Sequence, residues 1–227
     1  MRLKRVKGFY KLSGMIRHLP NILTFIRLGL SIVFLWMILH SPHVERRVAF
    51  LNGAFVLFVV AGLTDVADGI VARRFNATSK FGRMVDPLAD KLLVVGAFVC
   101  FALIGEPKLF DWSSRTLAAI HWFVVAVLAC REVYVTILRH IAEAKGINFA
   151  ATASGKIKML LQSFAIGTVL IKMAYVPDRT WGYWFTSVTF AAMIVATIVS
   201  GFLATRRPSW RQFKKEGTPY ESSAPSS

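Results

Sequence analysis

Six long runs of apolar residues follow one another along the chain, separated by short polar segments that contain proline, glycine or charged side chains. Each run approaches the roughly 20 residues that an α-helix needs to cross the hydrocarbon core of a bilayer. Proline and glycine in the polar segments typically end helices. The pattern predicts an all-α, polytopic membrane protein with six transmembrane helices, at about residues 22–39, 48–71, 88–104, 117–141, 157–175 and 183–205.

The composition favours the same class of protein. Of the 227 residues, 55% are hydrophobic and only 18% are charged, which excludes nearly all soluble globular enzymes. The net charge of +16 would be typical of a nucleic-acid-binding protein, but the basic residues flank the apolar runs. We therefore expect membrane lipid, and no nucleic acid, as a partner. Cys100 and Cys130 lie inside apolar runs and match no metal or disulfide spacing.

Lys and Arg are distributed unevenly between the polar segments. Most of them lie before the first run and after the second, fourth and sixth runs. Because basic residues are retained on the cytoplasmic side, we expect both termini in the cytoplasm. Residues 20–206 form the membrane domain, and residues 207–227 form a tail that is first basic and then disordered. Residues 1–19, which are basic and amphipathic, are either an interfacial helix on anionic lipid or an unstructured segment.

Four aspartates lie at or near the ends of the second and third runs, namely Asp65, Asp68, Asp86 and Asp90. Burying an ionised residue in a bilayer costs about 2.5–3.5 kcal/mol, so the charges of these aspartates must be compensated by other groups. The first two are three residues apart and the last two are four apart, so each pair shares one helix face. If the two faces oppose each other, the carboxylates form a site of hard oxygen ligands for two Mg²⁺, Mn²⁺ or Ca²⁺ ions.

Small residues and an arginine accompany these aspartates. Gly69, Ala72 and Gly82 leave the backbone accessible to a ligand, and Arg73 can offer a two-pronged donor to a phosphate. Together with metal ligands, these residues favour a substrate that contains a pyrophosphate. The alternative interpretation is a set of structural salt bridges between the aspartates and the nearby basic residues Arg73, Arg83 and Lys91.

The segment from Asp65 to Asp90 resembles the signature of the CDP-alcohol phosphotransferase family. It reads Asp-x-x-Asp-Gly-x-x-Ala-Arg, eight residues, Gly, three residues, Asp, three residues, Asp. The resemblance implies a CDP-linked lipid as the donor, an alcohol as the acceptor, and two divalent cations, Mg²⁺ or Mn²⁺, between the aspartates and the pyrophosphate. It implies metal ligation by Asp65, Asp68 and Asp86, while Asp90 acts as general base and also touches a metal ion. It further implies a catalytic membrane domain that is a homodimer, with its active site facing the cytoplasm.

The same resemblance implies the residues that contact the donor, which are Asn21, Thr24, Arg27, Gly69, Ala72, Arg73 and Gly82. Three of them lie in the first apolar run, in a Pro-Asn-x-x-Thr-x-x-Arg segment similar to one common in the family. Asn21 and Thr24 share a helix face, and Arg27 follows one turn later. The alternative is that Asn21 caps this helix and Arg27 extends its head group to the membrane surface.

A second group of basic residues lies where the fourth run ends and the fifth begins. Arg131 is placed inside an apolar run, where a charge normally has a function, and Arg139 follows about two turns later. Ser154 is placed to cap the next helix, beside Lys156 and Lys158. Together these residues predict an anion site, occupied by the phosphate of the acceptor. The alternative is that Arg131 pairs with Glu132 or an aspartate, while the lysines only mark the cytoplasmic side.

This second group also resembles a subfamily. Arg131-Glu132, Arg139, and Gly-Lys-x-Lys-x-x-x-Gln over residues 155–162 are similar to the pattern of bacterial phosphatidylglycerophosphate synthases. The resemblance implies transfer of a phosphatidyl group from CDP-diacylglycerol to sn-glycerol 3-phosphate, with release of CMP, at the cytoplasmic membrane of a bacterium. Two alternatives keep the chemistry but use phosphatidylglycerol or inositol phosphate as the acceptor. A third, from another class, is a divalent cation transporter that uses the aspartates as its ion site.

Overall fold

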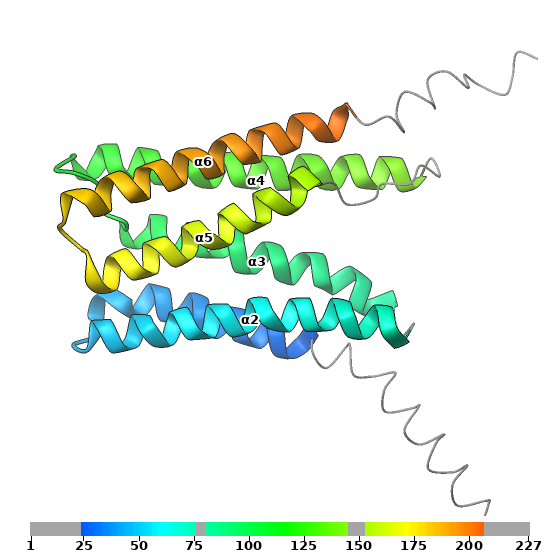
Figure 1. Ribbon diagram of the computed structural model, residues 1–227, viewed down its shortest axis with the longest axis horizontal. Helices are drawn as coiled ribbons and strands as arrows, with labels where there is room; N and C mark the ends of the chain where they lie inside the picture. The colour runs from blue at the N-terminus through cyan, green and yellow to red at the C-terminus, as the bar shows by residue number, and fades with distance from the viewer. Residues whose placement is uncertain (1–23, 76–79, 145–152, 207–227) are drawn as a thin grey trace, which may run out of the picture.

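A computed structural model describes the backbone of residues 24–75, 80–144 and 153–206, and side chains within these ranges except at 65–88, 90 and 143. Long helices make up nearly all of this part of the chain, which contains no strand (Figure 1). The first described helix covers residues 24–40. It is followed by a 3-10 turn η1 (Ser41–His43) and the helices α2 (Arg47–Phe75), α3 (Lys80–Ile104), α4 (Ser114–Ala144), α5 (Ala153–Tyr175) and α6 (Thr180–Thr205).

The prediction of an all-α polytopic membrane protein is confirmed. Five of the helices have segments long and apolar enough to cross a membrane, while α3 contributes a shorter apolar segment, Lys91–Ile104. Two helices extend beyond the predicted spans where they carry charged residues. The second helix runs four residues past position 71 to Phe75, and α3 begins at Lys80 rather than at 88. Because a helix satisfies its own backbone hydrogen bonds, it continues beyond the apolar run that signals it.

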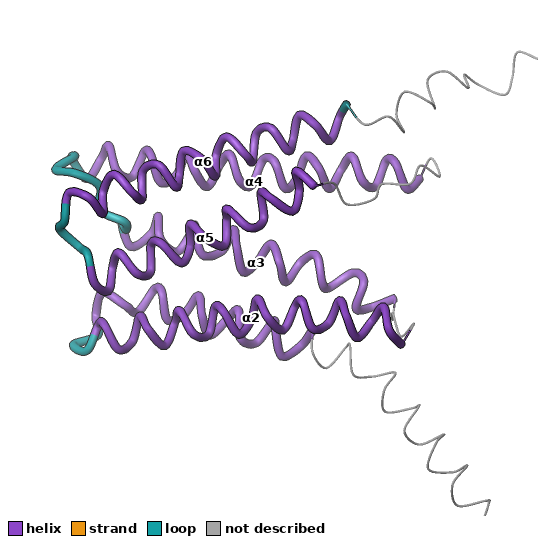
Figure 2. The backbone as a smooth tube through the Cα atoms, viewed as in Figure 1, coloured by secondary structure: helices purple, strands orange, loops and turns teal. Residues whose placement is uncertain are grey.

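Successive helices run in opposite directions through the bundle. The connections at 44–46, 105–113 and 176–179 all lie at one end, which we call the loop end (Figure 2). The first described residue and the last, residues 24 and 206, both lie toward the other end (Figure 1). We call this the open end. It is the end that the sequence predicts to face the cytoplasm.

Helix α5 occupies the centre of the packing. It contacts α2, α3 and α6, while α4 packs against α3 and α6. Gly167 lets α2 approach α5 closely, because a Cβ atom there would lie 3.3 Å from the ring of Phe55. The core between the helices is apolar and includes Phe34, Leu51, Phe58, Phe101, Leu128, Ile166, Leu170 and Met193.

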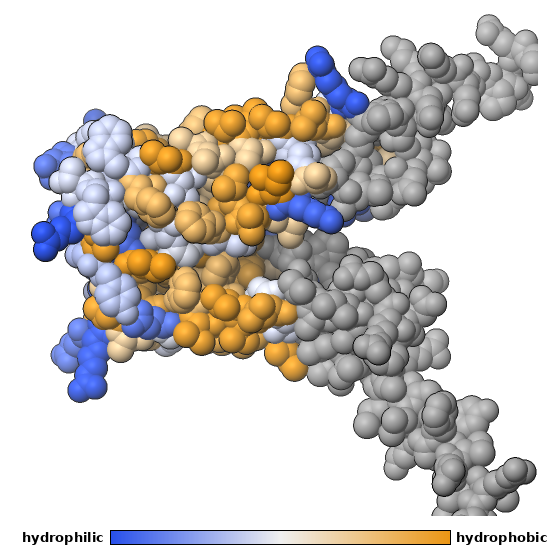
Figure 3. Space-filling view, viewed as in Figure 1, coloured by the Kyte–Doolittle hydropathy of each residue, from blue (hydrophilic) through white to orange (hydrophobic). Residues whose placement is uncertain are grey.

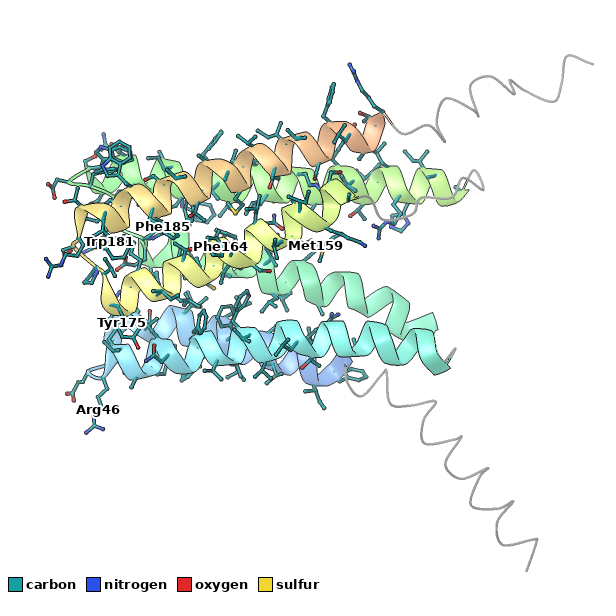
Figure 4. The ribbon with its side chains drawn as sticks, viewed as in Figure 1. Arg46, Met159, Phe164, Tyr175, Trp181 and Phe185 are labelled. Carbon is teal, nitrogen blue, oxygen red and sulfur yellow. The ribbon has the colours of Figure 1, made fainter. Side chains whose placement is uncertain are left out.

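The outside of the bundle is also apolar. Large side chains such as Leu160 and Val188 are exposed by 70% and 62%, and hydrophobic residues dominate the middle of the visible face (Figure 3). Phe164 of α5 and Phe185 of α6 lie together on this outer surface, with ring centroids 6.2 Å apart (Figure 4). Exposure of this much apolar surface to water would be unfavourable, so lipid is the medium that fits it.

Candidate active site

The aspartate signature is divided between two helices. Asp65 and Asp68 belong to α2, and Asp86 and Asp90 belong to α3, so each pair is held at helical spacing as the sequence argument requires. The side chains of these four residues lie outside the described part of the structure, and so do those of Gly69, Ala72, Arg73 and Gly82. Among the side chains that are described, no three His, Cys, Asp or Glu residues come together. The convergence of the four carboxylates therefore stays a prediction.

Two of the three residues predicted in the first helix are described, and both are buried. Thr24 is 4% exposed and Arg27 is 1% exposed, three residues apart on one helix face. Asn21 lies outside the described residues. The burial of Arg27 does not fit a side chain that extends its head group to water, because such a side chain keeps its guanidinium solvated. It fits a polar function inside the bundle.

The predicted acceptor-site residues Arg131 and Lys158 come together around Glu132. Nη1 of Arg131 donates a hydrogen bond to Oε1 of Glu132 over 3.1 Å. Nζ of Lys158 forms a hydrogen-bonded ion pair with the same oxygen. The contact links α4 to α5 inside the bundle, where Lys158 is only 4% exposed. The ion pair that the alternative interpretation requires for Arg131 is thus present, with a second cation added to it.

A serine on α6 holds the other side of Arg131. Nε and Nη2 of Arg131 both donate to Oγ of Ser200, over 3.1 and 2.7 Å. Ser200 is buried, and its hydroxyl faces the carbonyl oxygen of Thr197 over 3.4 Å. All three nitrogens of the guanidinium therefore contact protein groups, and its plane is fixed between α4 and α6.

A further polar contact extends this group to α3. Nζ of Lys91 donates to Oγ1 of Thr136 over 2.5 Å, and that hydroxyl donates to the backbone carbonyl of Glu132 over 2.6 Å. Lys91 directly follows Asp90 in the chain. The helix segment that carries the predicted base is thereby attached to the helix that carries Arg131 and Glu132.

The remaining predicted acceptor residues lie nearer the open end. Arg139 on α4 and Lys156 on α5 are both exposed. Ser154 lies at the beginning of the described part of α5, which starts at Ala153, so its role as a cap stays a prediction. Of the four predicted cations, the structure joins two and leaves two accessible.

Sequence reasoning gave no role to several polar residues that this region contains. Ser200 is one of several hydroxyl residues in its apolar run, and Thr136 resembles any hydroxyl that bonds its own helix, so neither sequence context indicates a partner. Gln162 lies one turn after Lys158 on α5 and is 2% exposed. Its Nε2 atom has no hydrogen-bond partner among the described residues. The signal for Gln162 in the sequence was its place at the end of the Gly-Lys-x-Lys-x-x-x-Gln pattern, one helical turn after Lys158.

Comparison with known proteins shows one family model and several bacterial proteins to which this chain is similar. The family model described as CDP-alcohol phosphatidyltransferase matches residues 17–203. A Bacillus subtilis protein named CDP-diacylglycerol–glycerol-3-phosphate 3-phosphatidyltransferase is 32% identical over 206 residues, which are 87% of this chain and 94% of that protein. A Mycobacterium tuberculosis protein named probable phosphatidylglycerophosphate synthase is 31% identical over 188 residues, 82% of this chain and 79% of its own. A Cereibacter sphaeroides protein with the same name as the first is 34% identical over 157 residues, 67% of this chain and 63% of its own.

Proposed function

Because the chain belongs to the CDP-alcohol phosphatidyltransferase family and is a phosphatidyltransferase, we propose that its donor is CDP-diacylglycerol and its acceptor sn-glycerol 3-phosphate. The products are phosphatidylglycerophosphate and CMP. The names of the relatives, which match most of this chain, support both substrates. The family alone leaves the acceptor open, so the acceptor needs an argument from this chain's own residues.

The observation that carries the choice of acceptor is that Arg131 and Lys158, from two different helices, meet at the carboxylate of Glu132. A structural ion pair needs one cation for one carboxylate, but here two cations of the bundle interior share one carboxylate oxygen. The other described Asp and Glu side chains belong to residues near the loop end, such as Glu106 and Asp178. Two cations held side by side in the interior of a membrane protein form a suitable site for an anion. The phosphate of the acceptor is such an anion.

The exposed cations extend the same argument toward the open end. Arg139 and Lys156 are placed to attract a phosphorylated acceptor, which then meets Arg131 and Lys158 deeper in the bundle. A neutral acceptor such as serine would need none of these four charges. The buried amide of Gln162, with its unused donor, also suits a polar ligand at this place.

The donor occupies the ends of α2 and α3 in this proposal. Arg73 binds the pyrophosphate, and Gly69, Ala72 and Gly82 leave room for the cytidine. The remaining donor contacts come from Asn21, Thr24 and Arg27 of the first helix. The burial of Thr24 and Arg27 supports a role inside the bundle for this helix face.

The carboxylates of Asp65, Asp68, Asp86 and Asp90 would hold two divalent cations. The donor set fits Mg²⁺ or Mn²⁺, because carboxylate oxygens are the hard ligands these ions prefer and both pairs lie on continuous helices. When bound, the ions would neutralise the phosphate oxygens and favour the departure of CMP.

The chemical step is a displacement at the phosphorus that carries the diacylglycerol group. An acceptor hydroxyl oxygen forms a bond to that phosphorus, its proton passes to the carboxylate of Asp90, and the bond from the phosphorus to the CMP oxygen breaks. The contact from Lys91 to Thr136 supports this role for Asp90, because it attaches the neighbouring residue of α3 to the helix of the acceptor site. Positioning of the two substrates by the helices is the main contribution of the protein.

We further propose the cytoplasmic membrane of a bacterium as the location, with the active site facing the cytoplasm and a homodimer as the assembly. The basic residues of the polar segments support the orientation, since most of them follow helices that end at the open end. The relatives with these names come from bacteria, which supports the membrane.

The test is CMP release by the purified full-length protein in detergent, supplied with CDP-diacylglycerol and Mg²⁺ or Mn²⁺. Glycerol 3-phosphate, inositol phosphate, phosphatidylglycerol and serine are tested separately. We expect release with glycerol 3-phosphate only, and loss of release when a chelator removes the divalent ions. Release with a different acceptor would refute the assignment of the basic group. Absence of release with every acceptor, from folded protein, would refute the proposed reaction and favour cation transport.

A further inference from the structure

We propose that Ser200 and Glu132 are positioning residues of the acceptor site, which orient the charged groups of Arg131 and Lys158 toward the acceptor's phosphate. This inference rests on the proposed function, because it concerns the same site. Neither residue binds the substrate in this proposal. Each acts through a cation that it holds.

The hydrogen bonds of Arg131 define the direction in which it can bind a ligand. A guanidinium group has five N–H bonds. The edge formed by Nε and Nη2 is occupied by Ser200, and one N–H of Nη1 is occupied by Glu132. Two N–H bonds, one on each terminal nitrogen, have no partner among the side chains that the structure describes. A phosphate can therefore meet Arg131 only from the side that Ser200 leaves open.

The surroundings of Ser200 fit the role of acceptor for this arginine. Its hydroxyl hydrogen has the carbonyl oxygen of Thr197 within 3.4 Å, which leaves the oxygen lone pairs for Arg131. The next residue is Gly201, where a Cβ atom would lie 3.5 Å from Cγ of Arg131, so helix α6 passes close along the stem of the arginine. An alanine at position 200 would leave two buried N–H bonds unpaired, and the guanidinium would be free to turn.

Glu132 fixes the position of the Lys158 ammonium group, as Ser200 fixes the guanidinium group of Arg131. A lysine ammonium on a flexible four-carbon stem has no fixed direction of its own, and its entropy must be reduced for it to bind at one point. The shared Oε1 atom of Glu132 fixes the ammonium at a set place beside the guanidinium. This contact holds the two cations side by side, so that one phosphate can meet both of them.

The test compares Ser200→Ala with Ser187→Ala in the full-length protein. Ser187 lies on the same helix, and its hydroxyl has no hydrogen-bond partner among the described residues, so it is a matched control for loss of one oxygen. We expect Ser200→Ala to raise the KM for glycerol 3-phosphate about tenfold, as loss of a hydrogen bond to a charged group does. The KM for CDP-diacylglycerol and kcat at saturation should stay within twofold, and Ser187→Ala should change neither KM.

A second variant tests position separately from charge. Glu132→Asp keeps the carboxylate but shortens the side chain by one methylene, so it cannot reach both cations. If Glu132 positions Lys158, the KM for glycerol 3-phosphate rises about tenfold or more while the charge of the site is unchanged. An unchanged acceptor KM in Glu132→Asp would overturn the inference. So would equal increases in both substrates' KM, because a loss of general packing would affect them alike.

Binding of glycerol 3-phosphate to the unmodified protein, measured by isothermal titration calorimetry, separates this inference from the proposed reaction. Binding that weakens in Ser200→Ala but not in Ser187→Ala would support the inference even if CMP were never released. Release of CMP with glycerol 3-phosphate, with acceptor affinity unchanged in both Ser200→Ala and Glu132→Asp, would sink the inference and leave the reaction intact.

Discussion

Two lysines of α5 have the same burial and opposite surroundings. Lys158 and Lys172 are each 4% exposed and lie on nearly the same face of the helix, one toward each end. Lys172 donates to the backbone carbonyl of Pro177 over 3.1 Å and lies 4.8 Å from the ring centroid of Tyr183. It stands near the negative end of the helix dipole, which favours a cation. Lys158 stands near the positive end, beside an arginine, with one shared carboxylate.

The difference shows that burial of a cation does not by itself mark a functional site. Lys172 is stabilised by a carbonyl, an aromatic face and the helix to which it belongs, so no ligand is needed to explain it. Lys158 instead lies beside a second cation, Arg131, and both contact the same carboxylate oxygen of Glu132. The ion pair at the loop end also differs from the Lys158 site, because it joins one cation to one carboxylate. Nη2 of Arg47 lies 2.9 Å from Oε1 of Glu106.

The largest difference in activity is expected between variants of two aspartates, one in the proposed metal site and one at the loop end. Asp65→Asn should lower CMP release by at least about 100-fold, because it removes a proposed metal ligand and the charge that holds it. Asp178→Asn makes the same change in an exposed connection at the loop end, and its rate should stay within twofold. Initial rates at saturating substrates measure both. Full activity in Asp65→Asn would contradict the metal assignment.

The two lysines themselves give the next contrast. Lys158→Met should raise the KM for glycerol 3-phosphate about 100-fold, since truncation of one partner in a buried charged contact costs roughly 2–5 kcal/mol. Lys172→Met should leave that KM unchanged and lower the free energy of unfolding by about 1.5–3 kcal/mol through loss of its charged hydrogen bond. Steady-state kinetics and thermal unfolding in detergent measure the two effects. If Lys172→Met raised the acceptor KM as much as Lys158→Met, the different surroundings of the two lysines would not explain acceptor binding.

A smaller effect is expected from the exposed cations. Arg139→Ala should raise the acceptor KM about fivefold and leave kcat nearly unchanged. The effect is small because water and salt screen the attraction between an exposed charge and the substrate. Its control is Arg179→Ala, an exposed arginine at the loop end. Repeating the kinetics at higher ionic strength should shrink the difference between Arg139→Ala and the unchanged protein. A difference that does not depend on salt would argue for direct contact instead.

The smallest effect belongs to the balanced pair of the loop end. Arg47→Ala should reduce stability by about 0.5–1 kcal/mol, since Arg47 is partly exposed and such pairs contribute little. Neither KM should change. Chemical denaturation monitored by circular dichroism is the measurement, with kinetics as its companion. An altered acceptor KM here would mean that the loop end also takes part in substrate binding.

The fold was predictable because each helix is signalled by its own apolar run. The helix ends were less so, since the runs stop where charged residues begin while the helices continue to Phe75 and start at Lys80. The candidate site was predictable in its residue types but not in its contacts. Arg131 and Glu132 are neighbours in sequence, which made their pairing one of two stated interpretations. The contact with Ser200, 69 positions later, depends on how α4 packs against α6, and no local pattern contains that information.

The positions of the connections have a consequence for how the chain enters the membrane. Three short segments at the loop end join the helices in consecutive pairs, so the bundle is built of three helical hairpins. With both termini in the cytoplasm, as we propose, each hairpin requires one short segment to be carried across the bilayer during synthesis. These segments contain almost equal numbers of acidic and basic residues, for example Glu45 beside Arg46 and Asp178 beside Arg179. Their near-neutral charge lowers the free-energy cost of that transfer, while the segments rich in Lys and Arg would not need to cross in this orientation.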